Sequence, residues 1–282
     1  MLWTALALTG ALFNALYYIT AKHWLRRCPE PLLAGSAFLC AGLILLLIAA
    51  ITHLPLPGPE ILPVLTVSAI LNTAAVRLTF RALATTDISL AIPFLSFTPL
   101  FLVLTSWLIL GERPGAGGMA GILLIVAGSY LLGGSGGISA PFHALSSHPG
   151  AALMLCVAAI YSITANVDKI LLINAGLFVG YGIDLLCIGC FLLIFAAFDR
   201  SSLHGCGVLP PLVLGGLLAI EIMAIGSALL IQIVPYVISV KRTSILFAVL
   251  LGGALFREGE RLRRGLSAGM MVAGAACILL MP

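Results

Sequence analysis

The chain has 282 residues and a formal net charge of +4, with 61% hydrophobic and only 9% charged residues. A soluble domain carries about a quarter charged residues, so this composition excludes a soluble globular protein. We expect an all-α protein whose partner is the lipid bilayer, and no nucleic-acid partner.

Ten apolar runs follow one another along the chain. Each has about 18 or more residues, which as a helix is enough to cross a hydrocarbon core of about 30 Å. The segments between them are mostly short, so no soluble domain fits. We expect an integral, multi-pass protein of the cell (plasma or inner) membrane. The ten predicted transmembrane helices lie at about 2–21, 32–53, 61–81, 88–110, 117–134, 149–173, 177–198, 209–233, 235–256 and 264–281.

The first run, 2–21, could be taken for a secretory signal because it is apolar and begins at Met1. A signal peptide, however, has a basic start and a small-residue cleavage site before a mature domain. The opening letters MLWTALALTG carry no charge, and residues 15–22 recur later in the chain. We therefore expect a permanent membrane helix here.

The chain contains an internal repeat. The letters ALYYITAK at 15–22 match AIYSITAN at 159–166, a shift of 144 positions, and later helices match at shifts of 146 or 147. A nearly constant shift across five consecutive helices indicates a duplicated unit. The domains are therefore a first half, 1–134, a linker, 135–148, and a second half, 149–282.

Each half has an odd number of helices, so the second half must enter the membrane from the side opposite to the first. Two inverted five-helix repeats, related by a pseudo-two-fold axis in the membrane plane, are a recurring architecture of secondary transporters. In such proteins the substrate site lies near the midplane, between the halves. This inference does not depend on any motif.

The blocks 94–132 and 239–280 resemble the two repeats of the EamA-like branch of the drug/metabolite transporter superfamily. The similarity rests on Leu-Gly-Glu-Arg-Pro at 110–114 and on the Val-Ala-Gly that follows at 126–128. The resemblance implies ten helices in two inverted repeats and a central cavity lined mainly by helices 1–4 and 6–9. It also implies that helices 5 and 10 are peripheral, and that both termini are cytoplasmic.

The loop charges conflict with this orientation. Basic residues gather in the loops after odd-numbered helices, whereas the loops after even-numbered helices contain only Arg113, unless Lys169 is included. By the positive-inside rule, this bias would place both termini outside. We keep the orientation that the resemblance implies, because an uncharged N-terminus does not strongly determine the orientation of the first helix in the membrane.

Several charges stand where the other half has an apolar or small residue. Lys241 and Arg242 fall on Leu95 and Ser96 when the halves are aligned. Both could extend to the interface, or one could pair with Glu221. Alternatively they bind an anion, since Arg presents a planar fork to carboxylate or phosphate and Lys adds a point charge.

The sugar-phosphate and nucleotide-sugar branches are similar in carrying a Lys-Arg pair in the ninth helix, where it holds a phosphate. Those branches add a third basic residue from the fourth helix. The matching position here is Leu95, with Arg77 in the third helix as a substitute. The departure argues against a strict sugar-phosphate assignment.

Other candidate binding residues lie on predicted helix faces. Glu221 is either an ion-pair partner, a neutral buried acid, a proton-coupling group or a ligand for a substrate ammonium. Tyr17 and Tyr161 are symmetry mates, either lining a cavity or bonding between helices. Asn14 shares the face of Tyr17, and Asp168 that of Tyr161. Asn72 and Gln232 are weaker candidates, since single amides often serve helix packing. Asp184 is a further charge that the repeat does not reproduce, because it falls on Ala37.

The remaining motifs point away from catalysis. Seven cysteines give an odd count and no disulfide framework, and Cys187-x-x-Cys190 lies within a predicted helix as two small apolar side chains. No His/Glu pair has metal-ligand spacing, and no phosphate-binding Gly-Lys loop is present. We expect no enzyme, no catalytic residue, no metal and no cofactor.

The leading hypothesis is a secondary transporter, a permease or exporter, that moves a small polar, anionic metabolite by alternating access. A flippase of the same fold for a lipid headgroup or lipid phosphate is an alternative. A non-transporting membrane enzyme or structural subunit is the alternative from another class. The small-residue motifs Gly117-x3-Gly121 and Gly265-x3-Gly269 serve either internal packing or a homodimer through helices 5 and 10.

Overall fold

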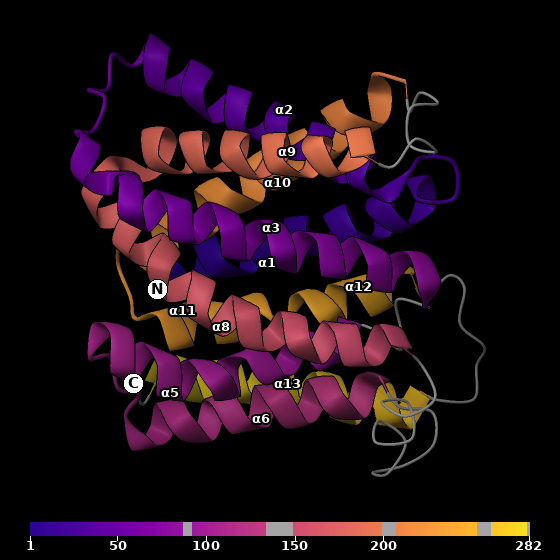
Figure 1. Cartoon of the computed structure of the whole chain (residues 1–282). Helices are drawn as coiled ribbons and strands as arrows, with labels where there is room; N and C mark the ends of the chain where they lie inside the picture. Colours follow the sequence, from indigo (N-terminus) through magenta and orange to yellow (C-terminus); the bar gives the residue numbers. More distant parts are fainter. Residues whose placement is uncertain (87–91, 134–148, 199–206, 253–260, 281–282) are drawn as a thin grey trace.

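The computed structural model describes residues 1–86, 92–133, 149–198, 207–252 and 261–280. These residues form an all-helical bundle, and no strand occurs among them (Figure 1). The helices of the first half are α1 (Leu2–Trp24), α2 (Glu30–Ile51), α3 (Leu62–Thr85), the 3-10 helix η2 (Ile92–Phe97), α5 (Thr98–Leu110) and α6 (Ala116–Gly133). Those of the second half are α8 (Pro149–Ala175), the π-helical turn η3 (Gly176–Gly180), α9 (Tyr181–Phe198), α10 (Leu209–Leu229), α11 (Val234–Lys241), α12 (Ser244–Gly252) and α13 (Arg261–Leu280).

Five helical segments of the described ranges are long and apolar enough to cross a membrane: Leu2–Trp24, Glu30–Ile51, Pro59–Thr85, Pro149–Phe198 and Leu209–Leu229. The fourth contains both α8 and α9. Shorter apolar helices occupy Phe94–Leu110, Ala116–Leu131 and Gly265–Leu280. The chain is therefore a multi-pass membrane protein, and the ten-helix inverted repeat stays a prediction.

The outward faces of the helices are apolar. Leu43 and Leu47 of α2 are 60% and 61% exposed, and Ile70 of α3 and Leu108 of α5 are exposed as well. Exposed apolar side chains on several neighbouring helices would be unfavourable in water, but they match the hydrocarbon of a bilayer. The surface of the bundle thus supports the membrane assignment made from composition.

The two halves pack against each other reciprocally. Helix α1 packs on α10 and α3 packs on α8, while α2 packs on α9 and α6 on α13. Figure 1 shows the α6/α13 and α2/α9 pairs at opposite edges of the bundle. In the predicted repeat α8, α9, α10 and α13 correspond to α1, α2, α3 and α6. Exchanging the halves therefore reproduces the same set of contacts.

Glycines allow the closest of these contacts. A Cβ on Gly121 would lie 2.5 Å from the carbonyl oxygen of Gly274, and one on Gly274 would lie 2.6 Å from that of Gly121. The backbones of α6 and α13 therefore touch, as small residues permit in membrane helices. Gly121 serves internal packing, whereas Gly265 and Gly269 have open space around their Cβ positions among the described atoms.

Two helices are interrupted at corresponding places. The predicted fourth helix is divided into η2 and α5, which meet between Phe97 and Thr98. The predicted ninth helix is divided into α11 and α12, with Arg242 and Thr243 between them. Pro99 occupies the start of α5, where its missing N–H costs little. At the shift of 146, Thr98 corresponds to Ser244, so the interruptions coincide in the repeat.

The cysteines differ in part from expectation. Cys28, in the segment between α1 and α2, is disulfide-bonded, so the expectation from the odd count was wrong there. Cys187 and Cys190 of α9 are free. Among the described residues, no group of three or more His, Cys, Asp or Glu side chains could hold a metal ion.

Candidate functional site

A cavity of about 160 Å³ lies in the interior of the bundle. Residues of α1, α2, α3, α8, α9, α10 and α11 line it, whereas no described residue of η2, α5, α6 or α13 does. The fourth predicted helix therefore departs from the implied lining, and α6 and α13 are peripheral, as the resemblance implies. The charged side chains in the lining are Asp168, Asp184, Glu221, Lys241 and Arg242.

Lys241 and Glu221 form an ion pair across the cavity wall. Lys241 Nζ lies 2.7 Å from Glu221 Oε1, and Asn14 Nδ2 donates a hydrogen bond of 2.9 Å to the same oxygen. Glu221 is buried, while the Lys241 side chain is 21% exposed. The ion pair considered as one alternative in the sequence therefore forms, and the charge of Lys241 is balanced within the protein.

Arg242 is a buried cation that forms no ion pair with a described carboxylate. It is 4% exposed, and its Nη2 donates a hydrogen bond of 2.9 Å to Thr98 Oγ1. Its Nε has no hydrogen-bond partner, and no carboxylate oxygen in the described ranges lies within 4.0 Å of its guanidinium. Burying a charge that has no ion-pair partner is costly.

Aromatic side chains form a large part of the wall. Tyr17 packs edge-to-face on Tyr18 and Phe80, with ring centroids 5.7 and 6.2 Å apart. The Tyr17 hydroxyl is buried and has no hydrogen-bond partner among the described groups. Tyr161 and Tyr181 also line the cavity, so a solute there meets rigid aromatic faces and hydroxyl groups.

Two acidic side chains occupy another part of the wall. Ser68 Oγ lies 2.7 Å from Asp168 Oδ1 and 3.0 Å from Asp184 Oδ2. Asn72 Nδ2 lies 3.1 Å from Ser68 Oγ and 3.0 Å from Asp168 Oδ1. Within the part of the chain that the structure describes, neither aspartate has a basic nitrogen within 4.0 Å. Helices α3, α8 and α9 thus meet at one polar cluster.

The structure brings most of the predicted site residues together. Lining the cavity are Asn14, Tyr17, Asn72, Tyr161, Glu221, Lys241 and Arg242. Arg77 lies outside the lining, with its guanidinium carbon 4.3 Å from the centre of the Phe195 ring. This cation-π contact of α3 with α9 occupies the side chain that was predicted to replace the third basic residue.

Sequence reasoning did not place the acidic cluster in the site. Asp184 was visible as a charge opposite Ala37 of the first half, and Asp168 as a neighbour of Tyr161 on one helix face. Ser68, which joins them, gives no signal, because a serine in an apolar helix more often bonds its own backbone.

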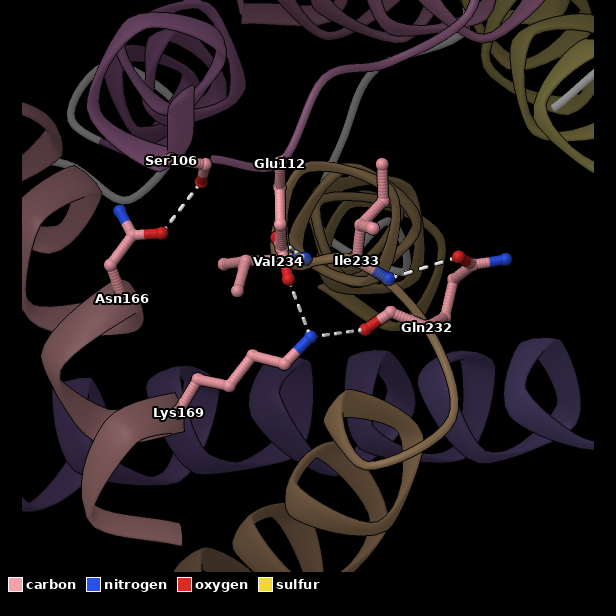
Figure 2. A network of polar contacts seen from close by, with 7 residues as sticks. All are labelled: Ser106, Glu112, Asn166, Lys169, Gln232, Ile233 and Val234. Carbon is pink, nitrogen blue, oxygen red and sulfur yellow. Dashed lines mark hydrogen bonds and ion pairs between the residues drawn. The ribbon is translucent and has the colours of Figure 1, made fainter. Parts of the chain in front are cut away.

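A second polar network lies outside the cavity lining (Figure 2). Lys169 Nζ lies 2.6 Å from Glu112 Oε1 and donates a hydrogen bond of 2.9 Å to the carbonyl oxygen of Gln232. The Val234 N–H donates a hydrogen bond of 2.7 Å to Glu112 Oε2. Glu112 therefore caps the start of α11, where free N–H groups favour a negative charge.

The turn that follows α5 explains the position of Glu112. Helix α5 ends at Leu110, and the φ of 69° at the next residue, Gly111, is left-handed and favours glycine over other residues. The turn directs the next residue toward α8 and α11 (Figure 2). The Leu-Gly-Glu part of the signature thus combines a helix stop with a carboxylate that joins the two halves.

Comparisons with known proteins agree with this architecture. The model of the EamA-like transporter family matches residues 1–134. No curated protein matches the chain. A protein known from its crystal structure is 20% identical, aligns over 99% of both chains and superposes with a TM-score of 0.81. At this identity the superposition shows the fold alone.

Proposed function

The EamA-like transporter family model matches residues 1–134, and from this premise we propose that the protein is a secondary transporter of a small anionic metabolite. Arg242 carries the proposal, because it presents a buried guanidinium with an unpartnered N–H at a cavity between the helices of both halves. A carboxylate or phosphate oxygen of the solute would complete its hydrogen bonding.

The neighbouring lysine has a different role. Lys241 is already paired with Glu221, so an anion reaching it must compete with that carboxylate. The moderate exposure of the lysine allows such an exchange of partners. Arg242 is therefore the primary anion ligand, and Lys241 adds positive potential once the solute has entered.

The interruptions of two helices support an anion at this place. Discontinuous helices in corresponding positions of two repeats commonly frame transporter sites, with half-helix N-termini directed at anionic groups. Here α12 begins at Ser244, two residues after Arg242, and α5 begins at Thr98, which Arg242 contacts.

The cavity limits the size of the solute. About 160 Å³ accommodates a metabolite of a few carbon atoms. The aromatic wall suits a solute with an apolar part beside its anionic group. Transport would proceed by alternating access, as the two halves move about the site between them.

The experiment is a thermal-shift screen of the detergent-purified protein against inorganic phosphate and short mono- and dicarboxylates. A ligand that binds only the folded state at 100 times its dissociation constant adds about 2.7 kcal/mol of stability. We expect an anion that stabilises the wild type and not Arg242→Gln. Arg77→Gln serves as the matched control, because it removes an arginine outside the cavity lining.

A stabilising anion is then tested for exchange across proteoliposome membranes. Arg242→Lys keeps the charge but loses the planar fork, so we expect weaker binding with the folded state retained. Equal stabilisation of wild type and Arg242→Gln by every anion would contradict the assignment of Arg242. A stabilising anion that is not transported would contradict the transport function.

A further inference from the structure

The hydrogen bonds from Ser68 to Asp168 and to Asp184 need two hydrogen atoms, and the serine hydroxyl supplies only one. A serine hydroxyl has one hydrogen to donate, and Ser68 Oγ lies within hydrogen-bond distance of a carboxyl oxygen on each side. The two N–H groups of Asn72 are directed to Ser68 Oγ and Asp168 Oδ1. If both carboxyl groups were ionised, one carboxylate oxygen would face the serine oxygen with no hydrogen between them.

An additional proton on one carboxyl group completes the set. Ser68 then donates to the ionised carboxylate and accepts from the protonated one, so every short contact contains a hydrogen. Two carboxyl groups that share a site in this way hold a proton between them, because two like charges at short range oppose each other. The pair then carries one negative charge.

No basic nitrogen of the described residues lies within 4.0 Å of either aspartate, and the charge of Lys241 acts on Asp168 from a greater distance. Among the described residues of the packed helices, Lys241 of α11 is paired with Glu221 of α10, and Lys169 of α8 with Glu112. Arg242 donates to Thr98, and Arg77 of α3 lies over a phenyl ring. The other titratable groups on α3, α8 and α9 are Arg81, Cys156, Tyr161, Tyr181, Cys187 and Cys190, and Cys40 of α2 lies against Gly215 of α10.

A second observation concerns an unpartnered oxygen in the cluster. Asp184 is 3% exposed, and its Oδ1 has no hydrogen-bond partner among the described groups. Both aspartates belong to the cavity lining, so this oxygen is on a side chain that borders the cavity. A purely structural hydrogen-bond network would normally satisfy a buried oxygen of this kind.

We propose that Asp168 and Asp184 are a proton-binding site that holds one exchangeable proton between them through Ser68. When α3 of the first half moves away from α8 and α9 of the second, the shared contact through Ser68 is lost, the proton passes to water in the cavity and a second carboxylate is left behind. The role of this site in coupling transport to a proton gradient rests on the proposed function. The presence of the proton does not depend on that function.

Infrared spectroscopy of the purified protein tests the site without a substrate. A protonated carboxylic acid has a C=O stretching band separate from those of carboxylates. We expect this band at pH 7 in the wild type, a shift of the band in D₂O, and its loss as the pH is raised. The double variant Asp168→Asn/Asp184→Asn should lack it, whereas Glu60→Gln should retain it because Glu60 is exposed and lies outside the cavity lining.

Isotope labelling keeps the test valid if the double variant does not fold. The wild type grown with ¹³C-labelled aspartate should show the band at lower frequency. A wild type without the band, a band that persists in the double variant, or a band unmoved by the label would overturn the proposal. Loss of anion binding in the Arg242 experiment leaves these results unchanged, so the two proposals fail independently.

Discussion

Arg242 donates a hydrogen bond from Nη2 to Thr98 Oγ1 at 2.9 Å, and this bond joins the interruption in the second half to the one in the first. Both residues are buried. The repeat places Thr98 opposite Ser244, only two positions beyond Arg242. The interrupted helices of the two halves therefore meet at the single side chain to which we assign the anion.

Removing the threonine hydroxyl tests this connection. Thr98→Val keeps the shape of the side chain but leaves the guanidinium with one partner fewer, which should cost about 1.5–3 kcal/mol because the bond involves a charged group. A lower melting temperature in detergent is the expected result. Thr66→Val is the control, since the exposed Thr66 bonds only to the carbonyl oxygen of Leu62 in its own helix. Equal melting temperatures for the two variants would contradict the prediction.

The ion pair in the cavity wall should show strong coupling. Lys241→Met leaves the buried Glu221 with only Asn14 as a partner, and breaking a buried pair costs about 3–5 kcal/mol. The partial exposure of Lys241 places the expected loss toward the lower end of that range. Lys241→Met/Glu221→Gln should recover part of the stability, as measured in a double-mutant cycle. Additive losses would show that the two side chains do not interact.

Glu112 should protect the start of α11 from hydrogen exchange. The Val234 N–H donates to Glu112 Oε2, so Glu112→Ala should accelerate deuterium uptake by this amide. Lys169→Met removes the ion pair and leaves the cap, so its effect on the same amide should be smaller. Mass spectrometry of peptides that contain Val234 makes the comparison. The assignment would be wrong if both variants left the uptake unchanged.

The glycine contact of α6 with α13 should tolerate no side chain. Gly121→Ala places a Cβ against the backbone of Gly274, and overpacking of this kind costs about 1–3 kcal/mol. Gly269→Ala is the matched control on α13, because its Cβ meets open space in the described part of the structure. A melting temperature lowered by the first change alone supports the contact. If Gly269→Leu also converts a dimer to a monomer in detergent, the predicted homodimer face includes α13.

The disulfide-bonded Cys28 favours one orientation over the other. Disulfides persist in oxidising compartments, and Cys28 lies between α1 and α2, at the end of α1 opposite to its start at Leu2. We therefore predict cytoplasmic termini, as the family resemblance implies, despite the basic residues in the same segment. Reporter fusions to the C-terminus measure this, with alkaline phosphatase inactive and a fluorescent protein active. The reverse pattern would favour the charge bias.

The sequence predicted the positions of the long helices well. The run predicted at about 32–53 is α2, Glu30–Ile51, and the run at 209–233 contains α10, Leu209–Leu229. It did not predict the interruptions in the fourth and ninth runs, because a few polar letters, SFTP at 96–99 and KRTS at 241–244, do not divide an otherwise apolar run. Contacts with other helices fix those positions, and such contacts leave no periodicity in a single sequence.

The site was predictable where a charge stood out against an apolar background. Lys241, Arg242 and Glu221 were found in that way, and all line the cavity. Asp184 was noticed but not placed, because its contact with Ser68 spans 116 positions in the chain. The separation of Arg77 from the site was equally hidden, since only the fold shows that it lies over Phe195.

Helices α6 and α13 contact each other through glycine backbones and contribute no described residue to the cavity lining. Mutations can therefore accumulate in the helices that line the cavity without disturbing this pair. Conversely, the pair can adapt to bilayer thickness or to a neighbouring protein without altering the cavity. A duplicated gene with this architecture can diverge at its cavity while the packing of this edge stays constant.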